Sequence, residues 1–311
     1  MRLGRLDSVR VLITGGSGLL GWWLARSFVK AGYHVVSTFN TSEPPGLEGA
    51  EWKRLDITRP EQVSRIVSES KPDIIIHSAA YTDVDGCEID RKKALEVNYY
   101  GTLWVSRATA SRGARLVYIS TDYVFDGLKG EYREGDEPNP INYYGLSKLL
   151  GEAASLASKD SLVVRVSGLY GYSPTGKRNF AINAVEKLLS GGVVKAFHDQ
   201  FLSPTYVPEL SDLIVKAVDM QAKGLIHIAG DRLSRYQQAL MIADVLGVPR
   251  DRVKPVSMRE LNLPAKRPRD SSLNTSRARS LGLAHKPHEE AVREFVRHYL
   301  SVKRRRVPSM G

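Results

Sequence analysis

Two residues of the sequence, Tyr144 and Lys148, have the types and the spacing of a proton-transfer pair. Residues four apart lie on one face of a helix, so the phenol and the ammonium can point into the same site. A Lys beside a Tyr favours the phenolate and is expected to lower the pKa of the phenol toward neutral pH. Tyr144 is therefore a candidate general acid or base. The alternative is a chance spacing on an exposed helix face.

A hydroxyl group is expected to join this pair. The segment Ser-Thr-Asp-Tyr-Val-Phe-Asp-Gly at residues 120–127 follows a strand predicted over residues 115–120. Side chains at the carboxyl end of a parallel strand face the ligand crevice, so Thr121 can bond the same oxygen that Tyr144 protonates. Thr121, Tyr144 and Lys148 together form a predicted catalytic group around one carbonyl oxygen.

A glycine loop near the N-terminus predicts a dinucleotide site, because it follows an apolar strand and opens a helix. Gly15 permits the tight turn, Gly18 lets the backbone approach a pyrophosphate, and Gly21 allows the helix and the strand to pack closely. The helix N-terminus, with Ser17 and Leu19, supplies N–H groups and a positive dipole end for the phosphates. The alternative is an ordinary glycine-rich turn.

Two further segments are predicted to line the cofactor. Asp56, followed by Ile57, ends a strand and could accept a hydrogen bond from the adenine amine; a helix N-cap or turn aspartate is the alternative. The small residues Ala79 and Ala80, followed by Tyr81, leave room for a ribose and a nicotinamide to lie flat. Simple tight packing is the alternative for these two alanines.

Cofactor choice depends on residues 37–42, Ser-Thr-Phe-Asn-Thr-Ser, at the end of the second predicted strand. An acidic group here would bond the ribose 2′-hydroxyl and repel a 2′-phosphate. No acid is present, so we predict that NADPH is preferred, with Asn40 among its contacts. No Arg stands there either, so we expect a modest preference, with NADH accepted as a weaker cofactor.

Composition limits the class of protein. The chain has 311 residues, 42% hydrophobic and 25% charged, and can bury a proper core. A single cysteine, Cys87, excludes an internal disulfide and suits a reducing compartment. No run approaches a transmembrane length, and residues 1–10 lack the apolar stretch of a signal peptide. We therefore expect a cytoplasmic protein with no membrane partner.

The net charge of +11 is concentrated near the C-terminus, where residues 251–311 hold 15 Lys and Arg against 6 Asp and Glu. The run Lys-Arg-Arg-Arg at residues 303–306 could indicate nucleic-acid binding. No aromatic interleaving or binding motif accompanies it, so we interpret the run as a solvated tail and do not expect a nucleic-acid partner.

The chain is predicted to fold as an α/β protein, a Rossmann-type doubly wound parallel sheet with a smaller C-terminal substrate lobe. Apolar strands alternate with helices over the first half, and residues 73–77 read as a strand buried on both faces. One long helix is expected over about residues 88–112. We assign residues 1–167, with returning segments around 200–222, to the nucleotide-binding domain, and residues 168–311 mainly to a discontinuous substrate-binding lobe.

These motifs resemble the dTDP-4-dehydrorhamnose reductase family of the extended short-chain dehydrogenase/reductase superfamily. The resemblance covers residues 9 to 285, and its motifs agree in order and number. Besides the glycine loop and Tyr-x-x-x-Lys, they comprise Lys71-Pro72-Asp73, residues 79–85 with Glu88, residues 120–127, Asn139-Pro140 before Tyr143, Asn179-Phe180, Asp199-Gln200, Ser203-Pro204-Thr205, and Arg267-Pro268 with Ser271 and Leu273.

The resemblance implies NADPH-dependent reduction of a 4-keto nucleotide sugar, with dTDP-4-dehydro-L-rhamnose giving dTDP-L-rhamnose. Tyr144 would deliver the proton, Thr121 would bond the developing alkoxide, and Lys148 would hold the nicotinamide ribose. Arg267 is expected to contact the diphosphate, because a planar guanidinium suits phosphate oxygens. The implied substrate contacts are Thr82, Val84, Thr121, Asp122, Phe125, Asn179, Phe180, Gln200 and Arg267.

Two departures and two alternatives accompany the resemblance. Family members often have Gln where Leu20 stands, and some carry a magnesium-binding Glu near Trp23 at a dimer interface. We therefore expect no metal, and a homodimer stays open without one. The same pattern occurs in the regulatory β subunit of methionine adenosyltransferase, so a non-catalytic NADP-binding subunit is one alternative. Reduction or epimerisation of another nucleotide sugar is the other.

Overall fold

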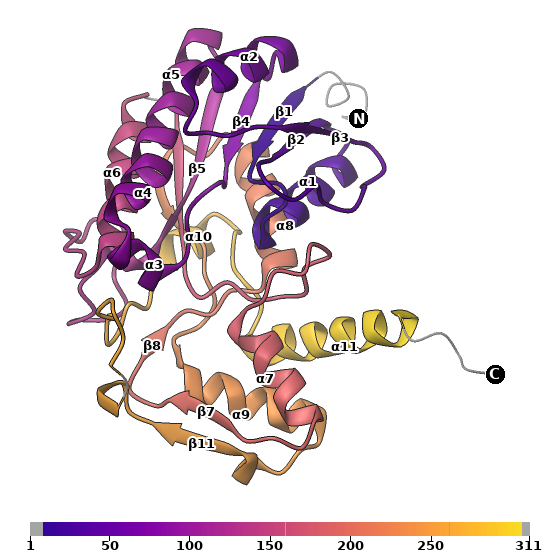
Figure 1. Ribbon diagram of the computed structural model, residues 1–311, viewed down its shortest axis with the longest axis vertical. Coiled ribbons are helices and arrows are strands. Elements are labelled where there is room, and N and C mark those ends of the chain that lie inside the picture. The colour runs from indigo at the N-terminus through magenta and orange to yellow at the C-terminus, as the bar shows by residue number, and fades with distance from the viewer. Residues whose placement is uncertain (1–8, 159, 261, 307–311) are drawn as a thin grey trace.

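The computed structural model describes residues 9–158, 160–260 and 262–306. Its central sheet has seven parallel strands in the order β3-β2-β1-β4-β5-β6-β9, which confirms the predicted doubly wound sheet (Figure 1). Two smaller pairs, parallel β7–β11 and antiparallel β8–β10, lie outside it. The strands are β1 (Arg10–Thr14), β2 (His34–Phe39), β3 (Ala50–Arg54), β4 (Ile74–His77), β5 (Arg115–Thr121), β6 (Leu162–Val166), β7 (Val194–Phe197), β8 (Phe201–Leu202), β9 (Gly224–His227), β10 (Leu233–Ser234) and β11 (Val253–Val256).

Helices cover both faces of the sheet. The α-helices are α1 (Leu19–Lys30), α2 (Pro60–Ser70), α3 (Val84–Ile89), α4 (Arg91–Leu95), α5 (Thr102–Arg112), α6 (Tyr143–Leu156), α7 (Phe180–Leu189), α8 (Val207–Asp219), α9 (Arg235–Leu246), α10 (Ser276–Ser280) and α11 (His288–Arg306). A π-helix, η1 (Glu96–Gly101), and the 3-10 helices η2 (Asp122–Val124), η3 (Arg250–Arg252) and η4 (Met258–Glu260) complete the elements. None of the helices in the described ranges is both long and apolar enough to cross a membrane.

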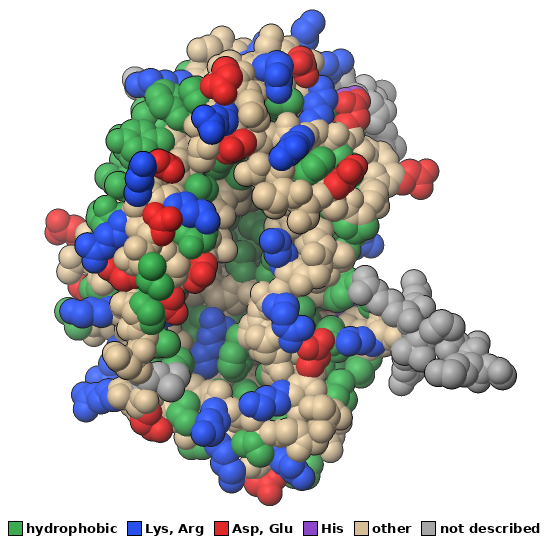
Figure 2. All heavy atoms as spheres, in the orientation of Figure 1, with side chains coloured by type: hydrophobic (Ala, Val, Ile, Leu, Met, Phe, Trp, Pro, Cys, Tyr) green, Lys and Arg blue, Asp and Glu red, His purple; other side chains and the backbone are tan. Residues whose placement is uncertain are grey.

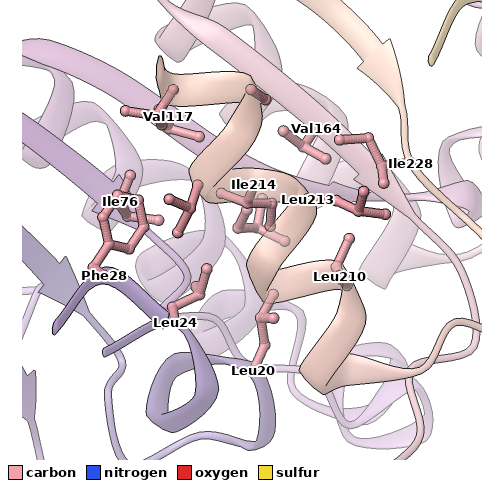
Figure 3. Packing of buried hydrophobic residues seen from close by; sticks show 14 of the residues in the cluster. Leu20, Leu24, Phe28, Ile76, Val117, Val164, Leu210, Leu213, Ile214 and Ile228 are labelled. Carbon is pink, nitrogen blue, oxygen red and sulfur yellow. The ribbon is translucent and has the colours of Figure 1, made fainter. Parts of the chain in front are cut away.

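The two faces of the sheet are packed by alternate residues of the same strands. On β4, Ile74 and Ile76 join the cluster formed with α1 and α8, whereas Ile75 joins the cluster formed with α2 and α5. Strand residues point alternately to opposite faces, so a strand buried on both faces has to be apolar throughout. Figure 3 shows the first cluster, in which Leu24 of α1 and Ile214 of α8 meet beneath the sheet.

The helix expected over residues 88–112 is confirmed over residues 91–112, where α4, η1 and α5 follow one another without a break. Its expected start is wrong, because Glu88 and Ile89 belong to α3 and Asp90 separates α3 from α4. Asp90 follows α3 and caps α4, because its side chain accepts a hydrogen bond from the backbone N–H of Lys93 at 2.9 Å. A side chain that bonds the backbone in this way ends one helix and starts another. The π-helix that follows carries the buried Asn98, and π-turns are frequent at functional sites.

A smaller lobe, consisting of α7, β7, α9, β11 and α11, has its own hydrophobic core (Figure 1). Helix α8 nevertheless packs on α1, and β9 pairs with β6 in the main sheet. Strand β9 thus lies just beyond the returning segments expected around 200–222. The domain boundaries themselves stay a prediction.

The basic run at residues 303–306 forms the last turn of α11. The ammonium of Lys303 lies 3.5 Å from a carboxylate oxygen of Glu186 on α7, so the run begins in contact with the lobe and not as a free tail. Residues 307–311, which the tail interpretation also covered, lie outside the described residues.

A buried ion pair holds α6 against the sheet. Arg165 of β6 donates to both carboxylate oxygens of Glu152 on α6, at 2.8 and 2.7 Å. Both side chains are only 3% exposed, and the Ser120 hydroxyl of β5 also donates to Glu152. Removing one partner of such a pair leaves the other charge buried without compensation.

We therefore expect Glu152→Gln to lower the free energy of unfolding by about 3–5 kcal/mol, measured by urea denaturation. The matched control is Asp244→Asn, because the Asp244–Arg250 pair is also bidentate but lies on the surface. This control should cost less than about 1 kcal/mol. Equal losses in the two variants would contradict the role given to the buried pair.

Candidate active site

The candidate site lies where the carboxyl ends of β1, β4 and β5 face the smaller lobe. Figure 2 shows a hollow between the part that holds the sheet and the smaller lobe, with Lys or Arg side chains on its floor. Thr121 ends β5, and Tyr144 lies in the first turn of α6. A crevice at this edge of a doubly wound sheet is the usual place for a ligand.

Thr121 and Tyr144 are brought together as the sequence predicts. A hydrogen bond with the Thr121 side chain lowers the pKa of Tyr144, but burial outweighs it and raises that pKa above its ordinary value. The ring of Tyr123 packs edge-on against Tyr144, with the centroids 5.8 Å apart. Tyr144 therefore keeps its proton at neutral pH.

Lys148 is buried beneath this pair and bonds the backbone. Its ammonium donates to the carbonyl oxygen of Ile119 at 2.7 Å and lies 4.2 Å from the ring centroid of Tyr118. Burial lowers the pKa of Lys148 to about 7. The expected lowering of the Tyr144 pKa by Lys148 is not found, because burial dominates at both residues and the ammonium is directed to the backbone of β5.

The start of α6 is held by three contacts that set the position of Tyr144. The Asn142 side chain caps the helix by accepting from the N–H of Gly145 at 2.8 Å, and Glu88 accepts from the N–H of Tyr143 at 2.9 Å. At Gly145 a Cβ would stand 2.0 Å from the carbonyl oxygen of Tyr123, so only glycine permits this approach.

The glycine loop has the geometry that a dinucleotide requires. Gly15 has a φ of +75°, and a Cβ there would stand 2.7 Å from the backbone of Ala79. A Cβ on Gly21 would meet the carbonyl oxygen of Gly15 at 2.1 Å, which explains the close packing of strand, loop and helix. Gly18 precedes α1 without a side-chain cap, so the N–H groups of the first turn stay free of side-chain oxygens. Such a helix start suits a phosphate.

A cavity of about 420 Å³ lies beyond this loop and gathers residues predicted for the adenosine end of the cofactor. It is lined by Asn40, Asp56, Ile57, Thr58, Asp90, Lys92, Lys93, Glu96 and Val97. One oxygen of Asp56 accepts from the N–H and the hydroxyl of Thr58, at 3.0 and 2.7 Å. Asp56 thus makes the turn that the alternative interpretation described, and it lines the cavity as well.

Two of the residues that line this cavity, Lys92 and Lys93 of α4, are cations. A third cation, Arg54 at the end of β3, donates to the carbonyl oxygen of the lining residue Asn40 at 3.0 Å. None of the three is near Asn40 in the sequence. The parallel pairing of β2 with β3, which sets Arg54 beside Phe39, is what brings Arg54 there.

Asn98 is a site residue that the sequence analysis missed. From the π-helix it accepts from the N–H of Tyr81 at 2.8 Å and donates to the Tyr81 carbonyl and the Ser147 hydroxyl, each at 3.0 Å. It therefore ties the predicted nicotinamide segment, Ala79 to Tyr81, to the helix that carries Tyr144. The isolated Asn in an apparent helix carried no local signal for this role.

The predicted substrate residues fall into different places. Phe125 is fully buried and stacks on Tyr132 with the centroids 4.1 Å apart, so it has no surface left for a ligand. Asn179 caps α7 through the N–H of Ile182 at 3.2 Å. Thr82 is exposed and Val84 partly so, both at the start of α3.

The other three predicted contacts, Gln200, Phe180 and Arg267, each contact another side chain. Gln200 is 3.4 Å from the Tyr123 hydroxyl, and the Phe180 ring lies 5.0 Å beneath the guanidinium of Arg235. Arg267 forms a bidentate ion pair with Asp85, at 3.0 and 2.8 Å.

The α1 position at which some relatives are expected to bind a metal is occupied by Trp23 in this chain. Trp23 is buried, donates to the Tyr172 carbonyl at 2.8 Å and packs edge-on against His298 of α11 at 5.4 Å. It therefore joins α1 to the smaller lobe. The described residues contain no group of three His, Cys, Asp or Glu side chains that could hold a metal ion.

Asp122 is buried beside Thr121, and three hydroxyl groups donate hydrogen bonds to its carboxyl group. Thr121 donates to one oxygen at 3.2 Å, and Ser167 and Ser271 donate to the other. Burial nevertheless raises the pKa of Asp122 to about 6. This carboxyl thus positions Thr121 and ties β5 to the Ser271 segment, and its oxygens are already taken up inside the protein.

The raised pKa makes a prediction about stability. The native state holds the Asp122 proton more tightly than the unfolded chain, so this stability is present near pH 4 and is lost as the pH rises through about 6. The free energy of unfolding of the wild type, minus that of Asp122→Asn, should fall by roughly 2 kcal/mol from pH 4 to pH 7 in urea titrations. If this difference between the two free energies of unfolding stayed constant with pH, the raised pKa of Asp122 would be contradicted.

The control is Asp126→Asn, because the Tyr132 hydroxyl holds the pKa of Asp126 below its ordinary value. A lowered carboxyl pKa gives stability that is lost as the pH falls, so the difference for this variant should rise with pH or stay flat.

Comparison with known proteins agrees with this geometry. A crystal structure of dTDP-4-dehydrorhamnose reductase from Bacillus anthracis in complex with NADP has a TM-score of 0.82, at 34% identity, over 93% of this chain and 99% of that chain. The dTDP-4-dehydrorhamnose reductase of Mycobacterium tuberculosis is 36% identical over 285 residues, 89% of this chain and 88% of that protein.

A relative from another functional class is nearly as similar. Methionine adenosyltransferase 2 subunit beta from Bos taurus is 31% identical over 305 residues, 95% of this chain and 89% of that protein. Residues 9–301 match the family described as RmlD substrate binding domain. That match spans nearly the whole chain, so the protein belongs to the RmlD substrate binding domain family.

Proposed function

We propose that this protein reduces the 4-keto group of a nucleotide-linked sugar with NADPH, converting dTDP-4-dehydro-L-rhamnose to dTDP-L-rhamnose. The observation that carries the proposal is the placement of Thr121, Tyr144 and Lys148 together at the carboxyl end of β5. The reductase from M. tuberculosis and the NADP complex from B. anthracis support the reaction and the cofactor.

The chain fits NADPH at three places. The Gly15–Gly21 loop would take the pyrophosphate, the cavity with Asn40 and Asp56 the adenosine, and Ala79 to Tyr81 the nicotinamide end. When bound, NADPH supplies the hydride that reduces carbon 4 of the sugar.

The residues around the keto oxygen supply the proton and stabilise the charge. Reduction needs a protonated donor, and burial keeps Tyr144 protonated by raising its pKa. Tyr144 passes its proton to the keto oxygen. The Thr121 hydroxyl turns its proton from Asp122 to the same oxygen as that oxygen gains charge, a donor effect of roughly 3 kcal/mol. Lys148 holds the end of β5 by donating to the carbonyl oxygen of Ile119, and its proposed further role is to hold the nicotinamide ribose.

A non-catalytic regulatory subunit is the competing function, and the relative from Bos taurus supports it. Such a subunit would bind NADPH and a partner enzyme without turnover. Oxidation of NADPH by the wild type in the presence of the keto sugar separates the two functions. A homodimer and a cytoplasmic location stay predictions.

Tyr144→Phe should reduce turnover of dTDP-4-dehydro-L-rhamnose by about 10²-fold or more, because the general acid is lost, while NADPH affinity stays near that of the wild type. Lys148→Met should reduce both turnover and NADPH affinity. Steady-state rates and fluorescence titration of NADPH measure the two effects. Wild-type turnover in Tyr144→Phe would mean that the proton comes from elsewhere.

Arg54→Gln should remove most of an NADPH-over-NADH preference of about tenfold, or roughly 1.4 kcal/mol, by weakening NADPH binding alone. The control is Lys53→Gln, because neighbouring strand residues point to opposite faces and Lys53 pairs with Glu69 at 3.4 Å. Competitive titration of both cofactors decides the point. An unchanged preference in Arg54→Gln, or an equal loss in the control, would refute the assignment of the NADPH preference to Arg54.

A further inference from the structure

Arg235 is a cation of the smaller lobe that the predicted site did not include. It is the first residue of α9, after Ser234 caps that helix by accepting from the N–H of Gln237 at 3.1 Å. Its own N–H donates to the carbonyl oxygen of Gln200 at 3.3 Å. The backbone therefore fixes Arg235 beside a predicted substrate contact.

The charge of Arg235 is not balanced by an acid. Across the described part of the chain, no carboxylate lies within ion-pair distance of this guanidinium. It bonds only the side-chain oxygen of Gln238 at 3.3 Å and lies on the ring of Phe180 at 5.0 Å. Arg235 is partly buried, and burial lowers its pKa.

Two other arginines of the same lobe are paired with acids. Arg178 bonds Glu186 at 2.5 Å, and Arg250 bonds Asp244 at 2.7 Å. A cation at the start of a helix also opposes the helix dipole, so Arg235 lowers the stability of α9 unless an anion is bound. A desolvated cation with no counter-ion at the edge of a crevice indicates an anionic ligand.

The contacts of Gln200 place this cation toward the reactive end of β5, because its carbonyl oxygen accepts from the Arg235 N–H and its side chain lies 3.4 Å from the Tyr123 hydroxyl. Burial raises the pKa of Tyr123, and the charges of Arg267 and Arg235 oppose that rise. Tyr123 thus lies within range of two guanidinium groups. One is that of Arg235 on α9, and the other is that of Arg267 in the loop that precedes Ser271.

The two guanidinium groups differ in how free they are. Asp85 already binds Arg267 in a bidentate pair, and Arg267 also donates to the Ala265 carbonyl at 2.9 Å. Most of its charge is therefore neutralised within the protein. Arg235 keeps its full charge and at least part of its donor fork for a ligand.

We propose that Arg235 is the main contact for the diphosphate of the nucleotide-linked substrate, and that Arg267 chiefly positions its loop through Asp85. The inference rests on the proposed function only in requiring a ligand with a nucleoside diphosphate. It assigns the specificity for a diphosphate to the first turn of α9.

The experiment is calorimetric titration of dTDP, UDP and GDP into the protein saturated with NADPH. Arg235→Gln should weaken the diphosphate that binds best by about 10- to 100-fold, the range for a lost charge-assisted hydrogen bond. Arg235→Lys, which keeps the charge but loses the fork, should lie between this variant and the wild type. Arg267→Gln should lose less affinity than Arg235→Gln.

Arg250→Gln is the matched control, because it removes the same charge from the other end of α9 and should leave binding unchanged. The affinity of the wild type should also fall more steeply with added salt than that of Arg235→Gln, which a purely structural role would not produce. Wild-type affinity in Arg235→Gln, or no diphosphate binding by the wild type, would overturn the inference. Loss of dTDP affinity in Arg235→Gln without reduction of dTDP-4-dehydro-L-rhamnose by the wild type would support the inference and refute the proposed reaction.

Discussion

The close approach of α6 to the carboxyl end of β5 is the constraint on which the site depends. Gly145 permits it, since any side chain would collide with the carbonyl oxygen of Tyr123. The approach puts Tyr144 beside Thr121 and directs Lys148 beneath the strand, where it bonds Ile119. Asn142 and Glu88 then hold the first turn of the helix, and the buried Glu152–Arg165 pair holds its body.

Burial at this junction sets the protonation states. It raises the pKa of Tyr144 and of Asp122, and it lowers that of Lys148. In each case the neutral form is favoured, which is the ordinary result of removing an ionisable group from water. A protonated phenol next to a hydroxyl suits the delivery of a proton to a carbonyl oxygen. The environment therefore matches the reductive direction of the proposed reaction.

The sequence predicted those features that depend on local spacing. The sheet, the glycine loop and the Tyr144–Lys148 pair follow from residues close together in the chain. Asn98 and Arg54 could not be found in this way, because the packing of the π-helix on Tyr81 and the pairing of β2 with β3 set their positions. The position of Arg235, the proposed diphosphate contact, depends on the folding of the smaller lobe.

The errors have the same origin. The direction of the Tyr144 pKa depends on burial that neighbouring residues in the chain do not reveal. The helix expected over residues 88–112 starts at Arg91 instead, because the Asp90 side chain bonds the backbone of Lys93 and caps a new helix. Phe125 matched a family motif, yet its ring stacks on Tyr132 in the core.

The central claim is that hydride and proton are added across a carbonyl group at carbon 4 of a nucleotide-linked sugar. The most direct measurement uses NADPH labelled with deuterium at its transferable position, together with dTDP-4-dehydro-L-rhamnose. Mass and proton spectra of the product then locate the label. The account predicts dTDP-L-rhamnose with one deuterium at carbon 4. Absence of the label from the sugar, or its presence at another carbon, would contradict the account.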